Sequence, residues 1–402
     1  MSTTLFAAPR TRSRTRRRAL GVATAMLVSV LAIPSSPVSA DGGGQKKVVV
    51  KEGESIQAAI DAAEPGTKIV VKGNHVEQVW INKSGIELIG RNATIVPPPP
   101  EERVLNPCTG GDETGPIIDR ATTICVHPPI DDFPEFPEFP SDDLFLNDIT
   151  VRGFDLPDAA FDAVAVFFTN HVHINRNTAV NPACDGIFVL FSSDFDVSRN
   201  TANGSQFCSG IEVAASEHGA IKRNETHDNL NNGIIANDTS YVAIERNNAS
   251  GSCYGINVGN PPDFFEVPST DVTIKRNTTN GNNLQCFPFG PDFPLGVTGI
   301  LVVGASNVLI ERNTANDNVS DAPSITAGGI AVFDWPGENP TDPPSAVSDN
   351  VQVGHNTAKG NSSAAGPVDL NIMTIGVGLD VHRNTCDVGV STAGPEPTWC
   401  KH

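Results

Sequence analysis

A short phrase repeated eight times between residues 171 and 386 constrains the fold of this chain more than any other feature. Each copy has an apolar residue, a spacer, Ile or Val, a second spacer and then Arg-Asn, except that His355 replaces Arg in one copy. Where no loop intervenes, the period is 23 or 24 residues. The alternation inside each copy predicts a strand, and a fixed period of this length predicts stacked repeat units. The copies end at Asn177, Asn200, Asn224, Asn247, Asn277, Asn313, Asn356 and Asn384.

A second phrase, Gly-Ile-x-Val or a close variant, precedes five of these Asn residues at a constant distance of thirteen residues. Each coil therefore contains a strand at Gly-Ile-x-Val, a strand that ends at Arg-Asn and a short third strand after the Asn. Three parallel strands per turn, with coils stacked about 4.8 Å apart, make a parallel β-helix. We expect the Asn residues to form an internal ladder. The second phrase is anchored at Val164, Ile187, Ile211, Ile234 and Ile300.

Residues 1–40 have the features of an export signal. Six Arg residues precede an apolar stretch at 19–33, and Val38-Ser39-Ala40 is a small-residue cleavage site. An uncleaved membrane anchor and a twin-arginine signal at 16–18 are the alternatives. No later segment is apolar over a length that spans a bilayer. We therefore expect a secreted, extracellular protein without membrane attachment once the signal is cleaved.

The charge of the mature chain excludes some partners. The signal contains six Arg and no acidic residue, so its removal changes the formal charge from −19 to −25. A chain this acidic is expected to bind neither nucleic acid nor anionic membranes. No cofactor is predicted, although a divalent cation such as calcium could bind a chain this acidic.

All eight Cys residues follow the signal, and an even number in an exported chain predicts disulfides. Cys184 and Cys208 have the same position in adjacent coils, which places them within disulfide reach. A zinc site is the competing interpretation, but the spacings lack Cys-x-x-Cys. The predicted pairs are Cys184–Cys208, Cys253–Cys286, Cys386–Cys400 and Cys108–Cys125.

Residues 54–63 predict a short amphipathic helix with Ser55 as its N-cap, which would cover the open end of the stack. The segment 53–63, GESIQAAIDAA, followed by PGTKIVV at 65–71, resembles the start of secreted right-handed β-helix proteins of the pectate-lyase-like superfamily, including NosD-type proteins. The downstream repeats resemble the same superfamily, so the resemblance covers nearly all of the mature chain. His75 replaces the Tyr expected in its Gly-x-Tyr-x-Glu segment.

This resemblance implies an all-β fold, a single-stranded right-handed parallel β-helix over 41–402 with a short N-terminal capping helix. Residues 97–147 interrupt the repeat with an irregular Pro-rich, acidic insertion, whose acidic Phe-Pro stretch at 131–143 cannot form a ladder strand. This insertion could wall a substrate surface, bind calcium or remain an extended solvated loop. The superfamily includes lyases, epimerases, hydrolases and non-catalytic members, so the fold is a weak guide to chemistry.

The coil alignment predicts one candidate catalytic column. Seven residues after the first Ile or Val of each Gly-Ile-x-Val phrase, successive coils present His171, Asp194, His218 and Tyr241. Imidazoles beside a carboxylate can chelate a divalent metal or serve as acid and base, and Tyr241 could donate a proton. The alternative is an ordinary solvated surface column.

Two further columns are candidates for ligand binding. Asp162 and Asp185 occupy equivalent positions just before the first strand of adjacent coils, and Glu212 points outward from that strand. Two stacked carboxylates repel each other, which raises the pKa of one of them or recruits a cation. We predict that these three residues bind substrate. The repeated Arg before each ladder Asn predicts a structural ladder paired with acids, and polyanion binding is the alternative.

The chain lacks the Asp-Asp and Gly-His-Gly pattern of polygalacturonase-like hydrolases and the Asp-Pro-His-Asp/Glu pattern of mannuronan epimerase-like enzymes. The first functional hypothesis is a secreted monomer that binds an extracellular polysaccharide and processes it by elimination or epimerisation. The alternative is a non-catalytic carbohydrate-binding or cell-envelope structural β-helix protein.

Overall fold

The computed structural model describes residues 46–104, 106–109, 121–129, 144–259, 268–284, 296–321, 324–337, 342–392 and 394–401. These residues belong to one unit, Gln45–His402. The predicted signal at 1–40 and the acidic Phe-Pro stretch at 131–143 lie outside them. No helix among the described residues has the length and apolar character needed to cross a membrane.

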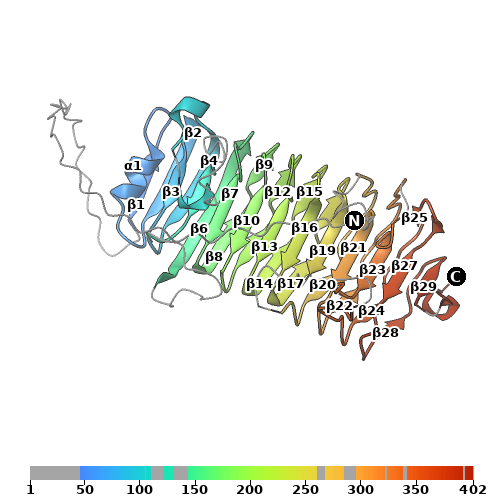
Figure 1. Cartoon of the computed structure of the whole chain (residues 1–402). Coiled ribbons are helices and arrows are strands. Elements are labelled where there is room, and N and C mark those ends of the chain that lie inside the picture. Colours follow the sequence, from blue (N-terminus) through green and yellow to red (C-terminus); the bar gives the residue numbers. More distant parts are fainter. Residues whose placement is uncertain are drawn as a thin grey trace, which may run out of the picture. The chain divides into compact units, whose positions relative to one another are not determined.

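Parallel strands stack coil upon coil in two long sheets, as the repeat period predicts (Figure 1). The first sheet contains 16 strands, and its long N-terminal strands continue into two separate faces of the solenoid. The shared strands are β1 (Lys47–Val50), β2 (Lys68–Val76), β4 (Glu87–Val96) and β6 (Leu146–Pro157). One face continues with β8 (Thr169–Asn175), β11 (Asp196–Ser198), β14 (Glu217–Lys222), β17 (Ser240–Glu245), β20 (Thr273–Lys275), β22 (Leu309–Glu311), β24 (Gln352–Gly354) and β28 (Asp380–His382). The other continues with β9 (Thr178–Val180), β12 (Thr201–Asn203), β15 (Glu225–His227) and β18 (Asn248–Ser250).

The second sheet contains 12 strands and carries the Gly-Ile-x-Val phrases. Ile187 pairs with Val164 on one side and with Ile211 on the other, as the coil alignment predicts. Its strands are β3 (Val79–Ile81), β5 (Ile124–Val126), β7 (Val164–Phe167), β10 (Ile187–Leu190), β13 (Ile211–Ala214), β16 (Asn232–Asn237), β19 (Tyr254–Gly259), β21 (Thr298–Val303), β23 (Gly328–Phe333), β27 (Leu370–Met373), β29 (Gly389–Ser391) and β30 (Gly394–Pro395). A separate hairpin joins β25 (Ser362–Ser363) to β26 (Gly366–Pro367).

Helix α1 (Ile56–Asp61) caps the N-terminal end and packs against β1, β2 and β3. The Ser55 hydroxyl accepts a hydrogen bond from the amide of Ala58 at 3.0 Å. The Glu77 carboxylate accepts from the Ile56 amide at 2.8 Å, so an acid from the connection between β2 and β3 also satisfies the first turn. The described residues also contain the short 3₁₀ helices η1 (Pro100–Glu102), η2 (Pro107–Thr109) and η5 (Pro397–Trp399).

The Asn ladder is complete. The Asn224 side-chain oxygen accepts from the backbone amide of Asn200 at 2.9 Å, while its Nδ2 donates to Asn247 Oδ1 at 3.1 Å and to the Val197 carbonyl at 2.9 Å. The same pattern continues to Asn384. A second internal ladder, which we did not predict, lies five residues further along each coil. Its members are Ser205, Asn229, Ser252, Asn282, Asn318, Asn361 and Asp369.

Residues with positive φ recur at fixed places in the coils and mark the turns between strands. Such a residue interrupts the alternation of side chains, so the residues around it cannot be assigned to the inside or outside by a period of two. Two of these columns concern function. The site column is Asp148, His171, Asp194, His218, Tyr241, Asp271, Asn307 and Asn350. The arginine column is Arg176, Arg199, Arg223, Arg246, Arg276, Arg312, His355 and Arg383.

Three predicted disulfides are present, Cys108–Cys125, Cys184–Cys208 and Cys386–Cys400. Cys253 is also disulfide-bonded. Its predicted partner Cys286 lies outside the described residues, so that pair stays a prediction. Disulfides of this number indicate a protein that folds in an oxidising compartment outside the cytoplasm.

The predicted insertion at 97–147 needs one correction. Strand β5 lies within it and pairs in parallel with β3 and β7, so Ile124–Val126 is a regular rung of the second sheet. The three residues are buried and apolar, and such a short run between Pro-rich stretches is too brief to show a period.

The core is a narrow column of Ile and Val side chains that point inward from all faces. One exception shows how closely successive coils are packed. A Cβ atom placed on Gly219 would lie 2.1 Å from the ring of Phe195 in the preceding coil. Phe195 is buried, so its ring occupies the volume that Gly219 leaves empty.

Candidate functional site

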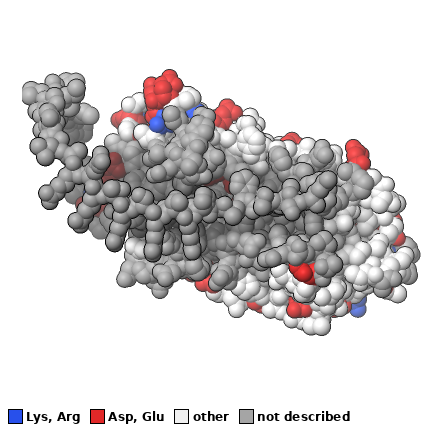
Figure 2. Space-filling model, in the orientation of Figure 1, with Lys and Arg blue, Asp and Glu red and all other residues white. Residues whose placement is uncertain are grey.

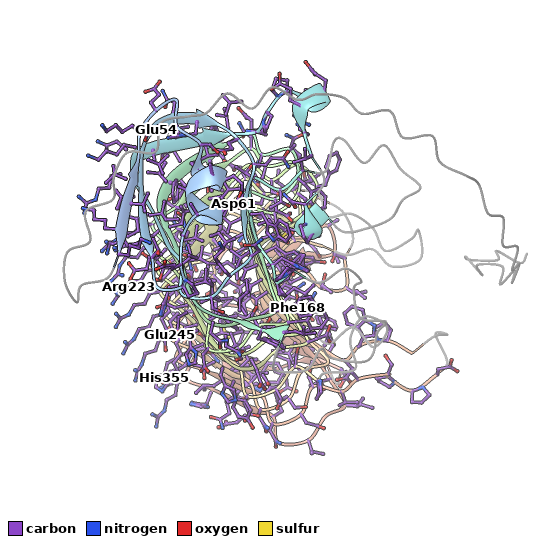
Figure 3. All side chains as sticks on the ribbon, turned by 90° about the vertical axis from the view of Figure 1, so that its left-hand side faces the viewer. Glu54, Asp61, Phe168, Arg223, Glu245 and His355 are labelled. Carbon is purple, nitrogen blue, oxygen red and sulfur yellow. A yellow bond between two sulfur atoms is a disulfide. The ribbon has the colours of Figure 1, made fainter. Side chains whose placement is uncertain are left out.

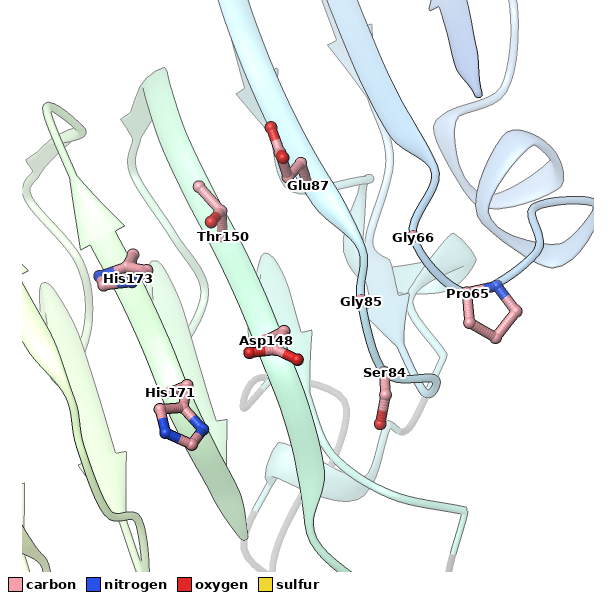
Figure 4. A pocket seen from close by; sticks show the side chains of 9 residues that line it. All are labelled: Pro65, Gly66, Ser84, Gly85, Glu87, Asp148, Thr150, His171 and His173. Atoms are coloured by element: carbon pink, nitrogen blue, oxygen red, sulfur yellow. The ribbon is translucent and has the colours of Figure 1, made fainter. Parts of the chain in front are cut away.

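The outer face of the first sheet contains an open pocket of about 550 Å³ near the N-terminal end. Asp148 and Thr150 project into it from β6, and His171 and His173 project from β8 (Figure 4). Glu87 of β4 and two turns, Pro65–Gly66 and Ser84–Gly85, complete the wall. The pocket thus combines two imidazoles with two carboxylates on one exposed surface.

The four residues of the predicted catalytic column lie in consecutive coils and point outward, although the assignment of a catalytic role stays a prediction. His171 Nε2 lies 3.7 Å from Asp194 Oδ2, and both side chains are more than half exposed. The rings of His218 and Tyr241 are parallel and stacked, with centroids 4.7 Å apart. The column therefore divides into an imidazole–carboxylate pair and a ring platform.

Positive φ is the local reason for this arrangement. All four residues have φ between 51° and 55°. His171, His218 and Tyr241 lie near the start of β8, β14 and β17, and Asp194 lies just before β11. Asn and Asp tolerate this conformation best, whereas His and Tyr are less usual there. An unusual residue type in a mildly strained conformation is a reason to look for function at the position.

Asp148, Thr150 and Glu87 belong to the pocket and were missed in the sequence. A signal existed for Asp148, because it precedes His171 by 23 residues, the same interval that separates His171 from Asp194. The signal was hidden because Asp148 follows directly on the acidic insertion. The site column therefore extends one coil further toward the N-terminus than predicted, into the pocket.

Asp162 and Asp185 do not lie on the surface. Both are at most 4 % exposed, and the Asp162 carboxylate accepts a hydrogen bond from the Asp185 amide at 3.0 Å. Asp185 in turn accepts from the Ser209 amide at 2.7 Å. Burial raises the pKa of Asp162 to about 8 and also raises the pKa of Asp185. These two carboxyl groups connect coils, and their burial excludes the direct contact with a polysaccharide that we predicted for them.

Glu212 is the one member of that predicted set with exposed surface, being half-buried on β13. Burial raises its pKa to about 7. It lies close enough to Asp185 for the charge of each to oppose ionisation of the other. The side chain is therefore a possible ligand contact, but it belongs to a different sheet from the pocket and forms no part of that site.

One group of metal-ligand type is present among the residues that the structure describes, namely Cys184, Asp185 and Cys208. Its two sulfurs are bonded to each other, so neither can act as a thiolate ligand. The expected divalent cation therefore has no assigned site in the described residues.

Comparison with known proteins identifies the family. A model of the right-handed beta helix region matches residues 162–390. The chain belongs to the right-handed beta helix family. This match confirms the predicted fold class and agrees with the resemblance to the pectate-lyase-like superfamily. A search of curated proteins gave no match.

Solved structures with similar folds include enzymes that act on polysaccharides. The periplasmic alginate epimerase AlgG is 14 % identical, with 85 % of this chain and 84 % of that chain covered and a TM-score of 0.52. The mannuronan C-5 epimerase AlgE4 A-module of Azotobacter vinelandii is 15 % identical, with 84 % and 90 % covered and a TM-score of 0.46. The catalytic domain of a GH87 alpha-1,3-glucanase is 11 % identical, with 91 % and 68 % covered and a TM-score of 0.42. At 14 % identity the likeness to AlgG shows the fold alone.

Proposed function

We propose that this right-handed beta helix protein is exported and binds an extracellular polysaccharide along the site column. The observation that carries the proposal is the continuous run of an acid-and-imidazole pocket, the His171–Asp194 pair and the stacked His218–Tyr241 platform on one exposed face. Successive coils offer these groups about 4.8 Å apart, a spacing comparable to the length of one sugar residue in an extended chain.

The chemistry of these groups suits sugars. The rings of His218 and Tyr241 cover each other's facing sides, so a pyranose can pack against their exposed edges and outer faces, while carboxylate and imidazole groups bind hydroxyls. The neighbouring acids Glu87 and Asp148 are expected to repel an anionic sugar from the pocket itself. Neutral sugar residues are therefore the best fit for the pocket end of the column.

The test is a binding assay with a panel of neutral and acidic polysaccharides, such as affinity electrophoresis. We expect Tyr241→Ala to weaken binding about tenfold, since one stacked ring contributes on the order of 1 kcal/mol or more. Phe207→Ala is the matched control, because Phe207 is an exposed ring outside the site column. Equal affinities for the two variants, or no retention of any polysaccharide by the native protein, would refute the proposal.

A second function, polysaccharide lyase activity, is favoured by the His171–Asp194 pair and would require a cation, because Glu87 and Asp148 beside His171 otherwise repel a uronate. In β-elimination a neutral His171 would take the proton from the carbon next to the uronate carboxylate. The bond from the neighbouring carbon to the glycosidic oxygen would break, a carbon–carbon double bond would form, and the departing oxygen would take a proton from water. Asp194 stabilises the imidazolium at 3.7 Å. All these groups approach the sugar from one side, which suits elimination better than epimerisation, where base and acid act on opposite faces.

The lyase hypothesis has a separate readout. The native protein should generate ultraviolet absorbance from unsaturated uronates, and His171→Ala should abolish it without loss of thermal stability, since an exposed substitution usually changes stability by about 0.5 kcal/mol or less. The assay is run with calcium and with a chelator, because the acidic pocket offers no cation to neutralise the substrate carboxylate. Binding without any new double bond or reducing end leaves the protein a non-catalytic binder.

A further inference from the structure

The arginine column is a cationic line on an acidic protein. Its side chains are exposed in every coil from Arg176 to Arg383, and seven steps of about 4.8 Å give it a length of about 34 Å. Figure 3 shows Arg223 and His355 on the same outer margin of the stack. On the face in Figure 2, by contrast, the described charged residues are mostly Asp and Glu.

These guanidinium groups lack the acidic partners that a structural ladder requires. Among the described residues, Arg312 is the one Arg of the column with an ion pair, at 3.5 Å from Glu311. Glu311 is shared, because Lys275 lies 3.4 Å from its other oxygen. The predicted pairing of the column with acids is therefore wrong for most of its members. Parallel cationic groups at this spacing repel one another and favour an external anion.

The backbone strengthens this argument. Every residue of the column has φ between 53° and 60°, a conformation that Gly, Asn and Asp adopt more readily than Arg. The positive-φ turn five residues later in each coil is filled by such residues, for example Asn181, Gly204 and Asp228. Arg at the earlier turn therefore costs both conformational and electrostatic free energy, and neither local geometry nor packing requires it.

A polar column runs beside the arginine column and limits the class of ligand. The residue that follows each ladder Asn points outward and is Thr in most coils, for example Thr201, Thr278 and Thr314. Hydroxyl groups beside guanidinium groups suit a sugar acid, whose hydroxyls and carboxylate they can bind. With His355 as its one ring, the column offers little for base stacking, so single-stranded nucleic acid is the less suitable polyanion.

We propose that the arginine column binds a linear acidic polysaccharide that lies along the stack, with its carboxylates facing successive coils. This surface shares no residue with the site column. The two columns lie at opposite ends of the same strands, since His171 precedes β8 residues Val172–Asn175 and Arg176 follows them. The inference goes beyond the proposed function, because either surface can bind its ligand without the other.

The test uses polygalacturonate as the acidic probe, dextran as the neutral one and single-stranded DNA as a competing polyanion. Arg199→Asn, Arg223→Asn and Arg246→Asn are combined, because Asn removes the charge and accepts positive φ. The control combines Lys47→Gln, Lys51→Gln and Lys72→Gln, which removes three exposed cations at the opposite, N-terminal part of the chain. Both triple variants have the same net charge.

We expect the Asn variant to bind polygalacturonate about tenfold or more weakly at low salt, because three exposed ion pairs are lost, whereas the Lys variant should bind as the native protein does. Native affinity should fall steeply with added salt, and dextran should not compete. His171→Ala should leave this binding unchanged, which separates the inference from the proposed function.

Several results would overturn the inference. They are absence of binding by the native protein, equal weakening in the two triple variants, and tighter binding of DNA than of polygalacturonate. A lower melting temperature of the Asn variant would show that the arginine column is structural, since a ligand-binding role predicts an unchanged or higher one.

Discussion

Replacing Asn224 by Ala tests whether the internal ladder holds the coils together. The substitution removes the acceptor of the Asn200 amide, at 2.9 Å, and the donor to the Val197 carbonyl, also at 2.9 Å. It also removes two side-chain bonds, with Asn200 and Asn247. Asn247 Oδ1 retains the backbone amide of residue 224, at 2.9 Å. The buried Asn200 amide is therefore left without its partner, whereas the Val197 carbonyl keeps its place in the parallel ladder of β11 with β14.

A buried group that loses its partner costs about 1–3 kcal/mol, so the free energy of unfolding should fall by about 1–3 kcal/mol. The loss is measured from urea unfolding curves followed by circular dichroism, with reversibility established for each variant. Asn248→Ala is the control, because Asn248 is exposed and belongs to the outward column of the next coil. It should change stability by about 0.5 kcal/mol or less.

A loss of less than about 1 kcal/mol for Asn224→Ala would refute the reasoning. That result would mean that water or a rearranged turn satisfies the Asn200 amide. A similar loss for both variants would refute it as well, because exposed and internal Asn residues would then contribute alike.

Two further predictions follow from the interior. Burial raises the pKa of Asp162 to about 8, above its unfolded value near 4. Between these pH values the folded state therefore binds more protons than the unfolded state. The stability that this group contributes is greatest below about pH 4 and is lost as pH rises through 8. Asp162→Asn should therefore reduce the fall in melting temperature between pH 5 and pH 8, and an unchanged pH profile would contradict the assignment. Gly219→Val should destabilise the protein by about 1–3 kcal/mol, because the new side chain collides with the ring of Phe195. Adding Phe195→Val should recover part of this loss. A double-mutant cycle should then give a coupling energy of about 0.5 kcal/mol or more. Strictly additive losses would show that the two side chains do not share that volume.

Spacing in the sequence was sufficient to predict the architecture and much of the register. A repeat of 23 or 24 residues brings equivalent residues of adjacent coils together, so the Asn ladder and the Cys184–Cys208 disulfide follow from counting. The α1 cap was equally visible, because Ser55 and the apolar positions Ile56 and Ile60 are local signals. The second ladder shows the limit of this approach, since its members vary between Ser, Asn and Asp and no single letter marks the column.

What the sequence by itself determined is which residues share a column, and what the tertiary structure decided is which way each column faces and what it contacts. Positive φ at the turns breaks the alternation of side chains, so a period of two cannot place residues near a turn inside or outside. Asp162 was therefore assigned to a binding surface although it is buried. The same limit applies to contacts between coils. Column membership alone does not specify side-chain positions in three dimensions. Those positions decide that His218 stacks on Tyr241, that Asp148 enters the pocket and that most of the arginine column lacks acidic partners.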